Sequence, residues 1–179
     1  CAPACSPINT NDECATAEAV TVGVSLISEN TCSTPSANSY PTCSSSFATH
    51  FDSWYSFNTG SNTSLEVSAT PTGAAVVGLA IYSGACGSLT QVACSTTGTG
   101  VFTLSASTDY YIRVYSLSAG TRGEYTLRVK TPCLTPSGLS VSDVSTEGAN
   151  LNWTASSSSN VGYEWAVTTS STPPPSGTF

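Results

Sequence analysis

Apolar and polar residues alternate along the first 130 positions of this chain, a period of two that is typical of β-strands and not of helices. In 124–130, for example, Tyr125, Leu127 and Val129 alternate with polar residues. Turns rich in Gly, Ser, Asn and Thr separate seven predicted strands: 19–27, 53–58, 64–69, 76–83, 100–105, 110–116 and 124–130. Short strands at this spacing predict an all-β fold, an antiparallel and jelly-roll-like β-sandwich.

The alternation also predicts which side chains point into the sandwich. In 110–116 every second residue, beginning with Tyr110, should face the core. The other side chains of this strand should face solvent, and they are Tyr111, Arg113 and Tyr115. Trp54, in the strand 53–58, is likewise expected on an outer face.

Two prolines interrupt the strand pattern at 131–136, which predicts a short, stiff linker between two domains. The first domain should span 11–130 and should follow an extended N-terminal segment, 1–10. The second, 137–179, contains three predicted strands and ends in a tail of Ser, Thr, Pro and Gly.

The chain contains eight Cys, and these lack the short C-x2-C spacing of zinc sites. An even number of Cys in a Gly-, Pro- and Ser-rich chain predicts a disulfide framework, and therefore an extracellular or cell-surface location. Two bonds are predicted from spacing: Cys86 with Cys94 across a hairpin, and Cys32 with Cys43 around a Ser-rich loop. Three pairings, or a bond to another chain, remain open for the others, which are Cys1, Cys5, Cys14 and Cys133.

The net charge is −7, from four basic and eleven acidic residues. This balance would repel a phosphate backbone, so nucleic acid is excluded as a partner. No stretch is apolar for long enough to insert into a membrane. Arg113 and Arg128 are predicted side by side on the outer face of consecutive strands. We expect them to form an interface with acidic groups, either Asp109 and Glu124 of the same domain or an acidic patch of another copy.

The first domain, over 11–130, resembles the bacterial pre-peptidase C-terminal (PPC) domain, in the Cys-rich form common in secreted proteins of the Bacteroidetes. The segments that carry the resemblance are NDECATAEAVTVG at 11–23, DSWYSF at 52–57, IYSGACGSLTQVAC at 81–94, YYIRVYS at 110–116 and GEYTLRV at 123–129. The second domain is similar to the first half of a fibronectin type III domain, through Pro136, Leu139, Val141, Trp153 and Tyr163. These resemblances imply a β-sandwich followed by a partial one.

A calcium site is one expectation from the PPC resemblance. In calcium-binding members of that family an Asn-Asp pair contributes ligands, and Asn11 and Asp12 match it here. With Glu13 they offer the oxygen ligands that Ca²⁺ prefers. The alternative is that Asn11 and Asp12 cap the turn into the first strand. No other cofactor is predicted.

Catalysis is not expected. His50 and Asp52 are two residues apart and share a predicted strand face, but no nucleophile motif such as G-x-S-x-G accompanies them. A bound glycan could stack on outward-facing aromatic residues, and the candidates are Trp54, Tyr111 and Tyr115. Cross-strand packing explains the same three residues without a ligand.

The second domain predicts an interface of its own. One apolar surface without an opposing sheet should be formed by Leu139, Val141, Leu151, Trp153, Tyr163 and Val167. If the chain is complete, segment 1–10 of another copy could add a strand there, and such head-to-tail contacts would propagate into a filament. If it is an excerpt, the remaining strands follow Phe179. The sequence therefore predicts a non-catalytic structural or adhesive module of a bacterial cell surface, with a carbohydrate-binding accessory module of a secreted hydrolase or peptidase as the alternative.

Overall fold

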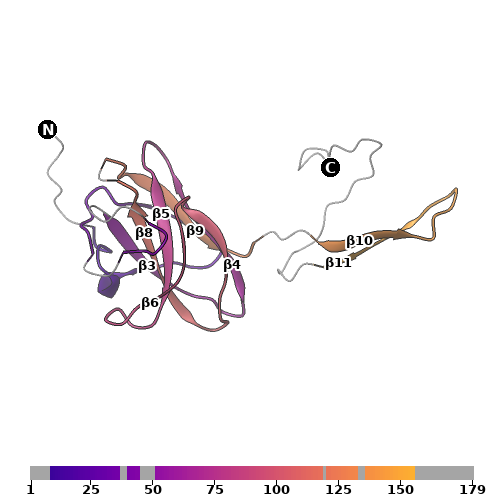
Figure 1. The fold of residues 1–179 in the computed structure, drawn as a ribbon, viewed down its shortest axis with the longest axis horizontal. Coiled ribbons are helices and arrows are strands. Elements are labelled where there is room, and N and C mark those ends of the chain that lie inside the picture. Colours follow the sequence, from indigo (N-terminus) through magenta and orange to yellow (C-terminus); the bar gives the residue numbers. More distant parts are fainter. Residues whose placement is uncertain (1–8, 37–39, 45–50, 119, 133–135, 156–179) are drawn as a thin grey trace. The chain divides into compact units, whose positions relative to one another are not determined.

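The computed structural model describes residues 9–36, 40–44, 51–118, 120–132 and 136–155 (Figure 1). The chain divides into two compact units, Cys1–Pro132 and Cys133–Phe179, which are described separately below. Apart from a three-residue 3-10 helix, η1 (Cys14–Thr16), the regular elements of these described ranges are all β-strands.

The first unit is a sandwich of two β-sheets. The five-stranded sheet has the order β1-β3-β8-β5-β6. Its strands are β1 (Glu18–Ala19), β3 (Asp52–Asn58), β5 (Val77–Ser83), β6 (Thr90–Ser95) and β8 (Asp109–Ser116). The four-stranded sheet has the order β2-β9-β4-β7, with β2 (Ser25–Glu29), β4 (Ser64–Pro71), β7 (Thr99–Thr103) and β9 (Glu124–Lys130). The predicted all-β sandwich is confirmed.

Side chains from both sheets form the main core. The predicted inward residues of β8 and β9 all lie in it, namely Tyr110, Ile112, Val114, Tyr125, Leu127 and Val129. Each buried Val, Leu or Ile contributes about 1.5–3 kcal/mol to folding. The phenol oxygens of Tyr55 and Tyr125 are 2.6 Å apart, and Tyr55 also donates to Ser28 Oγ at 2.6 Å. A hydrogen bond thus links the two sheets inside an otherwise apolar core.

Two parts of the strand pattern differ from the prediction. Segment 19–27 is not one strand, because β1 pairs in parallel with β3 while β2 pairs with β9 in the other sheet. Gly23 has a φ of +92°, which glycine adopts readily, and it turns the chain between the two sheets. Strand β6 is absent from the predicted set because its sequence, TQVACS, has few strongly strand-forming residues.

The outer face of the five-stranded sheet, which points away from the main core, is covered over much of its area. Trp54, Arg113 and Tyr115 are each 0% exposed, so the prediction that they face solvent is wrong. Together with Cys14 and Tyr82, the two aromatic residues belong to a second apolar cluster on this face. Alternation identified correctly which residues share a face, but it could not show that a second layer of chain covers that face.

Two disulfides attach the covering segments to the sheet. Cys14 bonds to Cys86 and Cys43 bonds to Cys94, with Cα–Cα distances of 5.6 and 6.1 Å. The predicted bond between Cys86 and Cys94 is wrong, because Cys94 lies opposite Ala80 in the β5–β6 ladder while Cys86 lies in the turn beyond the paired residues.

The other predicted disulfide, Cys32 with Cys43, is also wrong, because Cys43 bonds to Cys94. Cys32 is nevertheless disulfide-bonded. Cys1, Cys5 and Cys133 lie outside the described residues.

The described part of the second unit is a hairpin of β10 (Ser137–Ser142) and β11 (Asn150–Thr154). Val141 lies opposite Leu151, and since side chains two apart share a face, Leu139 and Trp153 lie on that same face. All four are exposed, at 72% for Leu139, 55% for Val141, 36% for Leu151 and 39% for Trp153. Two strands occur in many β-folds and do not identify a fibronectin type III domain. Tyr163 and Val167, which complete the predicted apolar surface, lie outside the described residues.

The absence of a side chain at Gly78 makes room for Tyr115, which lies opposite it in the β5–β8 ladder. A Cβ at this position would be 2.6 Å from Tyr115 Cζ. We therefore expect Gly78→Ala to destabilise the protein by about 1–3 kcal/mol through overpacking, measured by chemical denaturation. Gly73→Ala is the matched control, since a Cβ there meets nothing within 4 Å. Equal stability of the two variants would contradict this account of the covered face.

Candidate functional site

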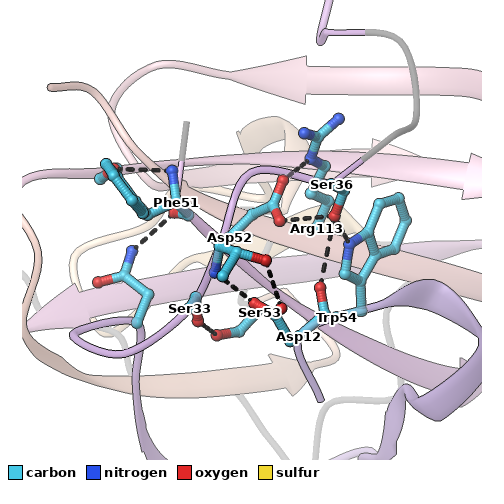
Figure 2. A network of polar contacts seen from close by, with 11 residues as sticks. Asp12, Ser33, Ser36, Phe51, Asp52, Ser53, Trp54 and Arg113 are labelled. Carbon is cyan, nitrogen blue, oxygen red and sulfur yellow. Dashed lines mark hydrogen bonds and ion pairs between the residues drawn. The ribbon is translucent and has the colours of Figure 1, made fainter. Parts of the chain in front are cut away.

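The outer face of the five-stranded sheet holds a buried ion pair between Asp52 of β3 and Arg113 of β8 (Figure 2). Arg113 Nε donates to Asp52 Oδ2, and both side chains are 0% exposed. Because burying a charge without a partner costs several kcal/mol, each of these two groups needs the other.

Ser36 and Trp54 complete the contacts of the carboxylate. Ser36 Oγ donates to Asp52 Oδ1 at 2.6 Å, and the Trp54 indole N–H donates to Ser36 Oγ at 2.7 Å. The Arg113 guanidinium carbon lies 5.4 Å from the centroid of the Trp54 ring, a distance at which a cation is attracted to the ring face. Both carboxylate oxygens therefore accept hydrogen bonds, and the guanidinium has an anionic and an aromatic neighbour.

The loop that carries Ser36 is held in place by its own hydrogen bonds, several of which are drawn in Figure 2. Asp12 Oδ1 accepts from the Thr34 backbone N–H at 2.5 Å, and Asp12 Oδ2 accepts from Thr34 Oγ1 at 2.6 Å. The hydroxyls of Ser33 and Ser53 are 2.9 Å apart, which ties the loop to β3. The N-terminal segment and this loop thus support each other over the ion pair.

Burial changes the ionisation of Asp52. It raises the pKa of the Asp52 carboxyl from its ordinary 3.8 to about 6, although the Arg113 charge and the hydrogen bonds of Ser36 and Arg113 oppose this shift. The free-energy cost of removing the Asp52 carboxylate from water is therefore larger than its attraction to the adjacent cation. Burial also raises the pKa of Tyr115 to about 12.

The network has no reactive arrangement among the described residues. Asp52 is fully committed to Arg113 and Ser36, and no substrate can reach it because it is 0% exposed. His50, its proposed neighbour in a catalytic group, lies outside the described residues. The arrangement stabilises the covered face, and neither the length of the Ser-rich loop nor any motif in the sequence indicated that Ser36 would lie between Asp52 and Trp54.

The proposed calcium ligands lie in the N-terminal segment that covers the sheet. The Asn11 carbonyl oxygen accepts from the Trp54 backbone N–H at 2.7 Å, and the Asp12 carboxylate is bonded to Thr34 rather than to its own turn. The pKa of Glu13 is raised by partial burial and by Asp12. In the part of the chain that the structure describes, no three His, Cys, Asp or Glu side chains are grouped to hold a metal ion. Calcium binding by Asn11, Asp12 and Glu13 stays a prediction.

The structure separates the predicted interface residues. Arg113 is buried in the five-stranded sheet, whereas Arg128 is exposed on β9 of the other sheet between Ser25 and Ser68. Their expected proximity is therefore wrong, because β8 belongs to the five-stranded sheet and β9 to the four-stranded sheet. Lys130 pairs with Glu66 at 3.2 Å. Leu151 and Trp153 are exposed on the hairpin of the second unit, and Tyr163 lies outside the described residues.

Of the three aromatic residues expected to bind a glycan, only Tyr111 keeps access to solvent. It lines an open groove beside β1, together with Ser56, Asn58 and Asp109. A second groove on the four-stranded sheet is lined by hydroxyl and charged residues and has no aromatic side chain among them: Ser25, Glu66, Ser68, Thr70, Thr72, Thr126, Arg128 and Lys130.

Removing one member of the buried ion pair should be costly. We expect Arg113→Met to lower the free energy of unfolding by about 3–5 kcal/mol, because it leaves a buried carboxylate without its cation. Lys130→Met is the control, since the Lys130–Glu66 pair is partly exposed and should be worth less than about 1 kcal/mol. Urea denaturation at neutral pH measures both, and a cost for Arg113→Met no larger than for the control would contradict the role of the pair.

The raised pKa of Asp52 predicts that its contribution to the free energy of unfolding depends on pH. Its carboxyl binds a proton more tightly in the folded than in the unfolded chain, so its contribution to stability falls as the pH rises from about 4 to about 6. The stability difference between the wild type and Asp52→Asn, from denaturation at each pH, isolates this group from the other carboxylates. The wild-type advantage should shrink across this interval. An advantage that grows with pH would mean that the attraction to Arg113 outweighs burial.

Solved structures similar to this chain include two that share little sequence identity with it. The crystal structure of the pre-peptidase C-terminal domain of collagenase from Bacillus anthracis is similar with a TM-score of 0.43 and 16% identity, over 64% of this chain and 94% of that one. A periplasmic inhibitor of g-type lysozyme from Aeromonas hydrophila, PliG, is similar with a TM-score of 0.40 and 11% identity, over 63% and 95%. None of the curated proteins compared matches the sequence.

Within the described ranges no helix has the length and hydropathy of a membrane span.

A family model assigns the chain to a family. Residues 10–129, more than half of the chain, match the model of a family described as galactose binding domain-like and associated with the type IX secretion system (T9SS). Together with the disulfides, this match indicates a secreted or cell-surface protein. Such families are binding or accessory modules rather than catalytic domains. The chain belongs to the T9SS-associated, galactose binding domain-like family.

Proposed function

We propose that this protein is a non-catalytic structural or adhesive module of the bacterial cell surface, and that it makes contacts with other copies or with neighbouring surface modules. The observation that carries the proposal is the closed outer face of the five-stranded sheet. There, a buried ion pair and two disulfides fasten the covering segments, while the described residues bring no reactive groups together. Such an arrangement favours mechanical and proteolytic resistance outside the cell, where chaperones and reducing agents are absent.

The surface that best supports contact with another copy is the apolar face of the β10–β11 hairpin. Leu139, Val141 and Leu151 share this face and are exposed. A two-stranded hairpin is at best marginally stable in water, so its apolar face needs further packing. Each Å² of apolar surface that a second copy removes from water contributes about 25 cal/mol to the contact.

Strand donation from an N-terminal segment is one way in which this contact could form. The structure limits the length of the donor, because Asn9 is already bound within the first unit. Asn9 Nδ2 donates to the Glu29 carbonyl oxygen at 2.7 Å and to Ser33 Oγ at 3.0 Å. A donated strand would therefore come from the residues before Asn9. Contacts between unlike surfaces of this kind extend into a filament when the rotation between successive copies does not close them into a ring.

Particle mass as a function of concentration tests this proposal. We expect the 18.2 kDa chain to associate with increasing concentration in light-scattering measurements, and Val141→Ser to weaken that association by removing an exposed apolar contact. Ser140→Ala is the control, because Ser140 faces the other side of the hairpin. A wild type that stays monomeric at all concentrations, or a Val141→Ser variant that associates as strongly as the wild type, would show that this face is not the contact.

A further inference from the structure

The four-stranded sheet ends in β7, which pairs with β4 on one side only. Hydrogen bonds at the two ends of the β4–β7 ladder define its pattern. The Leu104 N–H donates to the Thr63 carbonyl oxygen at 2.9 Å, and the Ala69 N–H donates to the Gly98 carbonyl oxygen at 2.7 Å. In an antiparallel ladder, pairs that exchange hydrogen bonds alternate with pairs that do not. The two ends therefore fix which residues of β7 bond to β4.

This alternation decides where the backbone groups of β7 point. Gly100 and Phe102 exchange hydrogen bonds with β4, whereas the N–H and C=O groups of Thr99, Val101 and Thr103 point away from it. Among the described residues, no other strand or loop bonds to the outward backbone groups of Val101 and Thr103. The open edge of β7 therefore presents donors and acceptors at the spacing of another β-strand.

The other three sheet edges of the first unit have features that oppose pairing with another chain. Strand β1 is two residues long and contains Glu18. Strand β2 ends at Glu29, whose carbonyl oxygen accepts from Asn9 Nδ2 at 2.7 Å. Strand β6 has an irregular register against β5 and is disulfide-bonded through Cys94. Short length, charge, bulges and covering segments are the usual means of avoiding edge-to-edge pairing. Strand β7 has no charged residue, no proline and an uninterrupted register.

The sequence of β7, TGVFT, is nearly symmetric about its central residue, Val101. When two copies of this strand are aligned antiparallel with Val101 at the centre, Thr99 of each copy lies opposite Thr103 of the other. These are the residues whose backbone groups point outward, so the alignment forms a hydrogen-bonded ladder. The Thr99 carbonyl oxygen already accepts from Ser95 Oγ at 2.7 Å, and its second lone pair can accept another bond.

The side chains of β7 fit the same alignment on both faces of the sheet. On the outer face, Val101 is 53% exposed and would pack against its counterpart. On the inner face, Gly100 would lie opposite the partner's Phe102. A Cβ at Gly100 would be 2.6 Å from Phe102 Cζ, so the glycine already makes room for the ring of its own strand. Phe102 is only partly buried, and pairing would cover it further.

Charge restricts where two copies can meet, because each chain carries a net charge of −7. The edge at β7 avoids this repulsion, since the strand itself is uncharged. On β4, Glu66 lies opposite Val101 and is paired with Lys130 at 3.2 Å. The strip beside the open edge is therefore close to neutral, which suits a second copy of the same strip.

We propose that β7 pairs with β7 of a second copy about a two-fold axis and joins the two four-stranded sheets into one continuous sheet. Because the same surface is used on both sides, this contact closes as a dimer. It lies in the first unit and does not use the β10–β11 hairpin. It therefore adds a second, symmetric contact to the proposed association between copies.

The Val141→Ser chain provides the parent for a test, because its substitution acts on the hairpin and leaves β7 unchanged. Its mass in light scattering should rise with concentration and level at about 36 kDa, twice the 18.2 kDa of one chain. Hydrogen exchange locates the contact. The amides of Val101 and Thr103 should exchange about tenfold more slowly, or slower still, once the dimer forms, whereas those of Gly100 and Phe102 should change little.

Substitutions in this parent test the pairing itself. Val101→Lys should weaken dimerisation by about tenfold or more, because two like charges would lie directly opposite each other across the axis. Val101→Pro is a second variant, since it removes an N–H that does not bond to β4 and is needed only for pairing. Ile27→Lys is the matched control, because Ile27 is 71% exposed on β2 at the other edge of the same sheet. It should dimerise like the parent.

Three results would overturn the proposal: a parent chain that stays monomeric at millimolar concentration, Val101→Lys that dimerises as tightly as Ile27→Lys, or a dimer without protection of the Val101 and Thr103 amides. Thermal denaturation shows that each variant is folded. Failure of the hairpin contact has a different result, because the wild type and Val141→Ser would then reach the same dimer mass.

Discussion

The ion pair of Asp52 and Arg113 is the interaction on which the outer layer of this protein depends. Two charges at 0% exposure are stable only when their partners are complete, and here the partners come from both the sheet and its cover. Arg113 and Trp54 belong to the sheet, whereas Ser36 belongs to a loop that lies over it. If the loop moved away, Asp52 would lose its hydrogen bond from Ser36 and would become accessible to water. The ion pair would then no longer be buried.

The cover itself is poor in apolar residues, so it cannot remain in place through hydrophobic burial alone. The two disulfides compensate for this by restricting the unfolded chain. Cys14 and Cys86 are 72 residues apart in sequence, and Cys43 and Cys94 are 51 apart. In the chain-entropy model, loops of this length stabilise a protein by about 4 kcal/mol each. Stability of the main core therefore comes from packed side chains, while stability of the outer layer comes from covalent bonds and buried polar contacts.

The covering segments also divide the outer face of the five-stranded sheet into a buried part and an exposed part. Where the covering segments lie over β3 and β8, the aromatic and charged residues become structural, as Trp54 and Tyr115 show. Where the cover ends, the same two strands present Tyr111 and Asp109 to solvent. The open groove lined by Tyr111 and Asp109 and the buried ion pair are thus neighbouring parts of one surface, and the extent of the cover decides which side chains are exposed to solvent.

The sequence by itself determined the fold class and most of the strands, because the period of two along β8 and β9 reflects which side chains are removed from water at the main core. It determined that the cysteines are oxidised, but not their partners, since spacing does not reveal which segments meet in space. It could not show that 19–27 divides between two sheets, that Arg113 pairs with Asp52 rather than lying beside Arg128, or that Tyr111 alone among the three outer aromatic candidates stays accessible. The tertiary structure decided these points, because burial of an outer face depends on residues distant in sequence that fold over it, and local alternation carries no information about them.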